Sequence, residues 1–287
     1  AVVQTNVPKL IIFMKSRFRN IFLVFGIVAV VIMLFTFDVS YEELLNNLKR
    51  AGIYLPLVLL LWLVIYAINA LSWYIIVRSG GKVSSLTFSK LYKFTVSGFA
   101  INYVTPVGLM GGEPYRIMEL TPYVGVERAT SSVILYVMMH IFSHFCLWLS
   151  AVVIYAVFYP VSWEMGIVLG LVTVFCLLLS ILFVKGYRHG MALACVHLGS
   201  KIPFLKKWVI RFSGTHKAKL ENIDSQIALL HRQKKSTFYS ALFLEYLARV
   251  VSCMEVWLIL NVLTTNVSFV SCVLILAFSS LLANLLF

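Results

Sequence analysis

A run rich in glycine and proline, Thr105 to Arg116, carries the residues best suited to bind an anion. It reads Thr-Pro-Val-Gly-Leu-Met-Gly-Gly-Glu-Pro-Tyr-Arg. Proline ends the preceding helix, glycines permit close backbone approach, and Pro114 favours the first turn of a new helix. That turn presents unpaired N–H groups with a partial positive charge, which together with Arg116 suit a phosphate. The candidate substrate-binding residues are Gly108, Gly111, Gly112, Glu113 and Arg116.

The same run also fits an ordinary loop followed by a simple helix-surface pair of Glu113 with Arg116, three residues apart. Both readings are open from spacing alone. A position at membrane depth would favour the binding site, because irregular backbone is tolerated there only where protein or a cavity surrounds it.

Three ionisable residues fall inside a later apolar run. Glu245 and Arg249 are spaced i,i+4, and Glu255 lies further along the same run. A charge at the bilayer centre costs at least about 2.5–3.5 kcal/mol, so these side chains should face the protein interior or a cavity. They are candidates for a coupling function, and the alternative is a structural ion pair. Glu255 has no partner nearby in the sequence, which makes it the better candidate for titration.

His140 and His144 share a helix face at i,i+4. This spacing can hold a metal, but no Glu follows His140 and no third ligand is evident. Packing or a hydrogen bond to a polar neighbour is favoured, and the two histidines are only weak metal candidates. No nucleophile-elbow, Walker or Rossmann pattern occurs in the sequence. We therefore expect no metal and no cofactor.

The composition excludes a soluble protein. Hydrophobic residues make up 61% of the chain and charged residues 12%, whereas soluble domains average about 45–50% and about 25%. The net charge is +13, but the basic residues lie between apolar runs, where the positive-inside rule predicts them. Without a nucleic-acid-reading motif, we expect no nucleic-acid partner.

The apolar runs predict an all-α polytopic membrane protein with about six transmembrane helices in a single domain, residues 1–287. The basic segment 185–235 is expected to be a cytoplasmic loop with an amphipathic helix at 216–232, and 1–20 a second amphipathic cytoplasmic helix. The predicted spans are 21–37, 53–77, 129–159, 165–184, 237–260 and 267–287.

Charge bias assigns the sides of the membrane. The turns near 159–164 and 263–268 carry no Lys or Arg and should lie outside, whereas 185–235 should lie inside. A full crossing by 86–104 would invert this assignment. We therefore predict a re-entrant helical hairpin that enters at Leu86 from the cytoplasm, breaks at 105–112 and returns before Arg128, with the N-terminus also cytoplasmic.

The string from Pro106 to Arg116, Pro-x-Gly-x-x-Gly-Gly-Glu-Pro-x-Arg, resembles the first signature of the lysylphosphatidylglycerol synthase transmembrane-region family, also called flippase-like domain proteins. The basic loop and its amphipathic helix fit that family, and the resemblance covers essentially the whole chain. It implies a multi-pass protein of a bacterial or archaeal inner membrane that moves or modifies lipids.

Two features of the family pattern lie beyond this sequence. A second Pro/Gly/Glu signature belongs where the sequence stops, and there is no initiator Met, so we expect truncation at both ends. The soluble aminoacyl transferase domain of the family's namesakes is absent as well. Lysyl transfer by this chain alone is therefore not expected.

The first functional hypothesis is a lipid translocase, carrying an anionic phospholipid or a polyprenyl-phosphate-linked lipid at the broken-helix site. Its partners would be membrane lipids, and a homo-oligomer is left open. The alternatives are a membrane-embedded lipid-modifying transferase, with Glu113 as general base, and a scaffold acting through 185–235. The lack of a nucleotide or sugar-donor motif favours a transporter over an enzyme. Within the site, Arg116 is expected to be the most function-sensitive residue.

Overall fold

The structure is a computed structural model that describes residues 24, 28, 31, 40–81, 83, 85–104, 112–189, 225, 235–263 and 266–286. These residues form helices and no strand. The helices, in chain order, are α2 (Tyr41–Ala51), α3 (Tyr54–Ser79), α4 (Phe88–Val104), α5 (Gly112–Val124), α6 (Val126–Phe158), α7 (Trp163–His189), α10 (Lys235–Leu263) and α11 (Phe269–Leu286).

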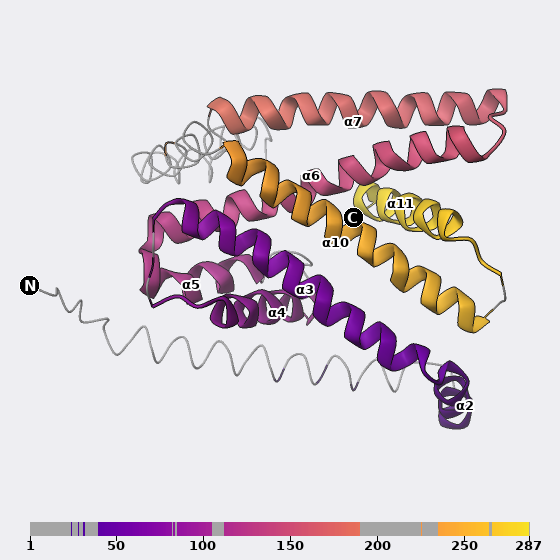
Figure 1. Ribbon diagram of the computed structural model, residues 1–287, viewed down its shortest axis with the longest axis horizontal. Helices are drawn as coiled ribbons and strands as arrows, with labels where there is room; N and C mark the ends of the chain where they lie inside the picture. Colours follow the sequence, from indigo (N-terminus) through magenta and orange to yellow (C-terminus); the bar gives the residue numbers. More distant parts are fainter. Residues whose placement is uncertain are drawn as a thin grey trace, which may run out of the picture.

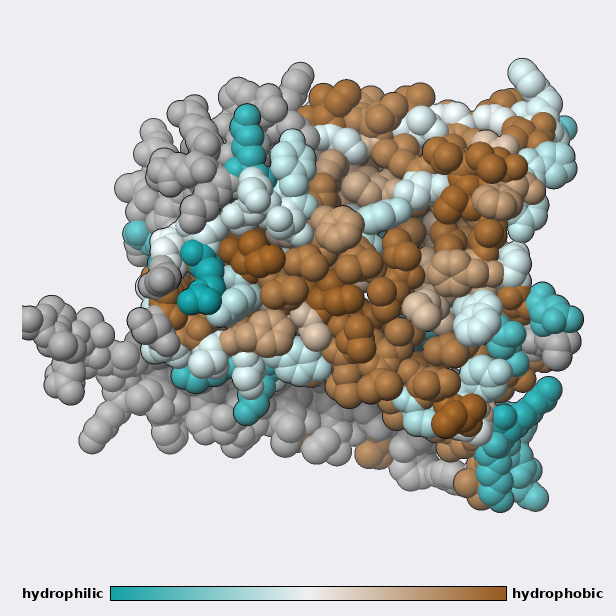
Figure 2. Space-filling view, viewed as in Figure 1, coloured by the Kyte–Doolittle hydropathy of each residue, from teal (hydrophilic) through white to brown (hydrophobic). Residues whose placement is uncertain are grey.

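Four of these helices, α3, α6, α7 and α10, are long and apolar enough to cross a membrane, and α11 is a shorter apolar helix. Apolar residues cover the middle of the face seen in Figure 2, while polar residues gather at its ends, most clearly on α2. The predicted all-α polytopic membrane fold is confirmed.

Several predicted segments lie outside the described residues. In the predicted span 21–37, only Val24, Val28 and Val31 are described, and all three are helical and exposed. The helix predicted for 1–20, and that for 216–232 apart from Ser225, fall outside as well.

The segment between the first two predicted spans contains a helix, α2, which is not among the elements predicted above. Ser40 caps it by accepting a hydrogen bond from the Glu43 amide at 3.1 Å. Acidic residues occupy its first turn and basic residues its last, as the helix dipole favours. Gly52, with φ of 49°, ends the helix in a conformation that favours glycine.

The long helices give the molecule two distinct ends (Figure 1). The turn between α6 and α7 and the connection between α10 and α11 lie at one end, together with α2. The C-terminal end of α3 and the starts of α6 and α10 lie at the other. Helices α3 and α10 run antiparallel and side by side, and they form the most extensive helix pair of the described chain.

Helices α4 and α5 form a hairpin that leaves and returns to one end of the molecule (Figure 1). Arg128, at the start of α6, donates hydrogen bonds from Nη2 to the carbonyl oxygens of Val77 at 2.8 Å and Gly81 at 2.7 Å. The residues before α4 and after α5 are therefore held together. The segment between the two helices, 105–111, lies outside the described residues.

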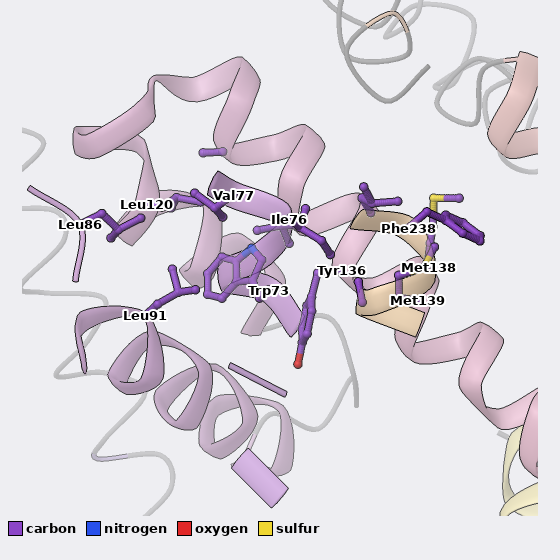
Figure 3. Close-up of a cluster of buried hydrophobic side chains, with 14 residues drawn as sticks. Trp73, Ile76, Val77, Leu86, Leu91, Leu120, Tyr136, Met138, Met139 and Phe238 are labelled. Atoms are coloured by element: carbon purple, nitrogen blue, oxygen red, sulfur yellow. The ribbon is translucent and has the colours of Figure 1, made fainter. Parts of the chain in front are cut away.

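The hairpin packs on the bundle through a core of buried side chains contributed by five helices. Trp73 of α3 lies among Leu91 of α4, Leu120 of α5 and Tyr136 of α6 (Figure 3), and Phe238 of α10 belongs to the same core. A second core joins α6, α7, α10 and α11. The first core fixes the hairpin against α3 and α6, which places the start of α5 inside the protein.

Candidate functional site: a buried charge cluster

The start of α5 touches α4 backbone to backbone. A Cβ atom added at Gly112 would lie 2.2 Å from the carbonyl oxygen of Gly98. A Cβ atom added at Gly98 would lie 2.6 Å from Nε of Arg116. Both distances are far below van der Waals contact. At Gly112 the clash is with backbone, so glycine is required there for the hairpin to close, whereas a side chain at Gly98 would displace Arg116.

A polar network ties the first turn of α5 to the last turn of α4. The Gly112 amide donates to Oδ1 of Asn102 at 2.6 Å, and Nδ2 of Asn102 donates to Oε1 of Glu113 at 3.2 Å. Nη1 of Arg116 forms an ion pair with the same Glu113 oxygen at 3.0 Å. Asn102 thus caps α5 from the neighbouring helix and also orients the acid of the pair.

Arg116 is enclosed by the chain. Its side chain is 1% exposed, and its guanidinium carbon lies 4.5 Å from the ring centre of Phe99 and 5.3 Å from that of Tyr136. Nη2 of Arg116 also donates to the Thr95 carbonyl at 3.4 Å. Two aromatic faces, a carboxylate and a carbonyl therefore compensate for the water that this cation has lost.

A second charged group connects α6 with α10. Nδ1 of His140 lies 2.8 Å from Oε2 of Glu245, which is 1% exposed. Nη2 of Arg249 forms a short hydrogen bond with the other ring nitrogen of His140, Nε2. Nε of Arg249 also donates to the Ser143 hydroxyl at 3.4 Å. The histidine thus bridges an acid and a base that stand one turn apart on α10.

These contacts define the tautomer of His140. A guanidinium group can only donate, so Nε2 must accept the hydrogen bond from Arg249. The ring proton is then on Nδ1 and is donated to Glu245. His140 is therefore a neutral bridge. Among the described residues no carboxylate lies within 4.0 Å of the Arg249 guanidinium, so its positive charge is not neutralised by a direct ion pair.

The two charged groups are joined by aromatic rings. The Phe99 ring, which covers Arg116, has its centre 5.8 Å from that of His140. The Tyr136 ring, on the same face of α6 as His140, lies 6.2 Å from the same histidine ring. Helices α4, α5, α6 and α10 thus build one charge cluster, consisting of Glu113, Arg116, His140, Glu245 and Arg249, in which Arg116 and Glu245 are buried and the other three are partly buried.

Several polar atoms in and beside the charge cluster are buried with no hydrogen-bond partner among the described residues. They are Oε2 of Glu113, Nε of Arg116, the Tyr136 hydroxyl and Oε1 of Glu245. Each such atom costs about 1–3 kcal/mol if it stays unsatisfied. The Tyr136 hydroxyl points away from the surrounding apolar core (Figure 3).

Glu255 has a partner that its sequence neighbours do not supply. Nε1 of Trp62, on α3, donates to Oε1 of Glu255 at 2.8 Å. The Trp62 ring lies 5.3 Å from Tyr66, and Tyr66 stacks on Phe99 at 5.3 Å. A row of aromatic rings therefore runs from Glu255 to the charge cluster.

An apolar groove lies further along α6. It has a volume of about 480 Å³ and is lined by residues of α6, α7 and α11, including Trp148, Tyr155, Leu169 and Phe278. The His144 ring lies 5.9 Å from that of His140 and 5.8 Å from that of Trp148. His140, His144 and Trp148 therefore form a file along one face of α6, which connects the charge cluster to the groove.

Comparison with known proteins identifies the family. A family model described as the lysylphosphatidylglycerol synthase TM region matches residues 21–287. The chain belongs to this family. Searches of curated proteins and of solved structures found no match. The resemblance stated for the Pro106–Arg116 string is thereby confirmed at the level of the family, and the chain is a multi-pass membrane protein of that family.

The sequence predicted five binding residues. Three of them, Gly112, Glu113 and Arg116, lie within the described part of the chain and close together. Gly108 and Gly111 fall outside the described residues. The Gly112 amide, which the sequence offers to a phosphate, is bound to Asn102. The three ionisable residues of α10 all point toward other helices, with partners at His140 and Trp62.

The sequence did not single out the residues that link the two charged groups. Asn102 was visible only as an interruption of an apolar stretch, and Phe99 and Tyr136 look like ordinary core aromatics. A polar residue ten positions before a helix-starting glycine is a weak signal that could have pointed to Asn102. As to metals, no group of three or more His, Cys, Asp or Glu residues in the described ranges is placed to hold an ion.

Proposed function

We propose that this protein is a lipid translocase that moves an anionic phospholipid or a polyprenyl-phosphate-linked lipid between membrane leaflets. The observation that carries the proposal is the charge cluster, buried in an apolar bundle where a helix pair is interrupted. Charges at membrane depth are expensive and mark pathways for polar groups. Broken helices near the membrane centre are a common way for transporters to hold anionic groups.

The headgroup phosphate binds in the charge cluster, next to the start of α5 with Gly112, Glu113 and Arg116, which Gly108 and Gly111 precede in the sequence. The apolar groove supports the proposal because a lipid needs two adjoining environments. Trp148 follows His140 by eight residues, which is about 12 Å along a helix. A headgroup at the charge cluster thus leaves its acyl chain within reach of the groove.

The hairpin enters the inner membrane from the cytoplasmic side and does not cross it. At 17 and 13 residues, α4 and α5 extend about 25 Å and 20 Å, less than the roughly 30 Å hydrocarbon core. Single cysteines introduced at Ser85 and Val126, both exposed, should react with an impermeant maleimide from the same side of oriented membranes. Labelling from opposite sides would contradict this topology.

Reconstituted vesicles test the function. The protein is inserted into vesicles containing trace fluorescent phosphatidylglycerol or phosphatidylcholine, and a quencher is added outside. The fraction of fluorophore protected from the quencher should fall with time, and faster for the anionic lipid. Lipids extracted at the end are analysed by mass spectrometry.

The variant Gly170→Ala is the matched control, because nothing lies within 4 Å of the added methyl group. It should exchange lipid at the wild-type rate. If the wild-type protein exchanges lipid no faster than protein-free vesicles do, translocation is contradicted. A new lipid species in the extract would instead assign the site to a lipid-modifying transferase.

A further inference from the structure

We propose that Arg249 is the cation that contacts the phosphate of the anionic ligand, and that neutral His140 is its resting partner while the site is empty. This deepens the proposed function and rests on it for the identity of the ligand as a lipid. The ligand class is a phosphate-bearing anion.

The two arginines of the charge cluster differ in their exposure and in the charge of their partners. Arg116 is 1% exposed and engages a carboxylate, a carbonyl and two aromatic rings. Arg249 is partly exposed, and its side-chain partners among the described residues are neutral, namely the His140 ring and the Ser143 hydroxyl. An arginine with five donors and no acid in contact among these residues is the stronger anion site.

The neutral bridge explains why Arg249 does not collapse onto Glu245. The acid and the base are one helical turn apart, a spacing that normally gives a direct pair. His140 occupies the position between them and satisfies Glu245 Oε2 through its Nδ1 proton. The guanidinium is thus kept one imidazole away from the carboxylate, so an incoming phosphate competes with a neutral acceptor and not with an anion.

An unpartnered polar atom nearby indicates where the phosphate would sit. Tyr136 is 1% exposed, its hydroxyl has no hydrogen-bond partner among the described residues, and its ring contacts that of His140. This hydroxyl can donate to an oxyanion held by Arg249, and such a charge-assisted hydrogen bond is among the strongest available.

The test measures binding separately from transport. The full chain is purified in detergent, and its affinity for phosphatidylglycerol and for phosphatidylcholine is measured by native mass spectrometry. Arg249→Gln should weaken phosphatidylglycerol binding about tenfold or more and phosphatidylcholine binding by a smaller factor, because the choline cation already offsets the charge of that lipid's phosphate. Arg249→Lys should be intermediate, because it keeps the charge but loses the planar donor geometry. Arg78→Gln removes the same charge from an exposed position on α3 and should bind as wild type.

The variant Glu245→Gln should change the affinity for phosphatidylglycerol in the opposite direction. The amide oxygen can still accept from His140, while the negative charge of the ionised carboxylate is removed. At a pH at which the Glu245 carboxyl is ionised, binding of phosphatidylglycerol should therefore strengthen several-fold. A purely structural role for this group predicts that both Arg249→Gln and Glu245→Gln lose binding. Circular dichroism and gel filtration verify that each variant is folded.

The outcomes separate the two proposals. Wild-type binding without leaflet exchange would overturn translocation and leave the Arg249 site standing. Unchanged phosphatidylglycerol affinity in folded Arg249→Gln would overturn the Arg249 site, whatever the transport result. Displacement of the lipid by millimolar inorganic phosphate would support the phosphate chemistry and assign the site to a soluble anion, whereas resistance to phosphate would support a lipid headgroup.

Discussion

Arg116 and Arg249 both belong to the charge cluster around His140, yet their surroundings differ. Around Arg116, α4 and α5 supply a carboxylate, a carbonyl and Phe99, and glycine contacts at Gly98 and Gly112 close the hairpin over it. Around Arg249, α6 supplies two neutral acceptors and no acid. The first arrangement stabilises a fold, and the second keeps a charge available. Buried charge alone therefore does not mark a binding residue.

The largest effect should come from breaking the ion pair that encloses Arg116. Removing one partner of a buried pair costs about 3–5 kcal/mol, because the other charge stays behind without compensation. Arg116→Gln should therefore lower the free energy of unfolding, measured by denaturant titration in mixed micelles, by an amount toward that range. Glu113 is 23% exposed, which places the expected loss at the lower end.

A double-mutant cycle sharpens the result. The double variant Glu113→Gln/Arg116→Gln should be less destabilised than the sum of the two single variants, with a coupling of about 0.5–3 kcal/mol. Additive effects would show that the Glu113–Arg116 ion pair does not stabilise the hairpin. Arg116 would then no longer differ from Arg249 in its structural role.

A somewhat smaller effect is expected from separating the hairpin helices. In Gly112→Ala the new methyl group meets the Gly98 carbonyl oxygen at 2.2 Å and Asn102 Oδ1 at 2.8 Å. Overpacking of this kind costs about 1–3 kcal/mol, since backbone has to move. Gly170→Ala on α7 makes no such contact and should unfold like the wild type. Equal stability of the two variants would mean that α4 and α5 are not in close contact.

Much of the fold follows from the sequence because apolar length is a local property. The predicted spans 53–77, 129–159, 165–184 and 237–260 correspond to α3, α6, α7 and α10, with ends that differ by a few residues. Helix α2 is not among the elements predicted from the sequence, although Ser40 and the acidic residues that follow it are local capping signals.

The site was predictable only in pieces. The glycine and proline residues predicted the start of α5, and charged residues within an apolar run predicted a site at Glu245 and Arg249. No local pattern indicates that these two sites would lie on either side of one cluster with His140, because that depends on how α4 and α5 pack against α6 and α10. Phe99 and Tyr136 make the connection, and aromatic residues in apolar helices have no sequence signature that separates this role from core packing.

The central claim is that Arg116 maintains the structure and Arg249 contacts the anion. The most direct test compares Arg116→Gln and Arg249→Gln in two measurements, unfolding free energy and exchange of phosphatidylglycerol in vesicles with matched protein insertion. We predict that Arg249→Gln is destabilised less than Arg116→Gln, since no direct ion pair is broken and the glutamine amide can still donate to His140, and yet that it loses most anionic lipid exchange. Arg116→Gln should show the larger decrease in unfolding free energy. Exchange at the wild-type rate in a stable Arg249→Gln protein would contradict the account.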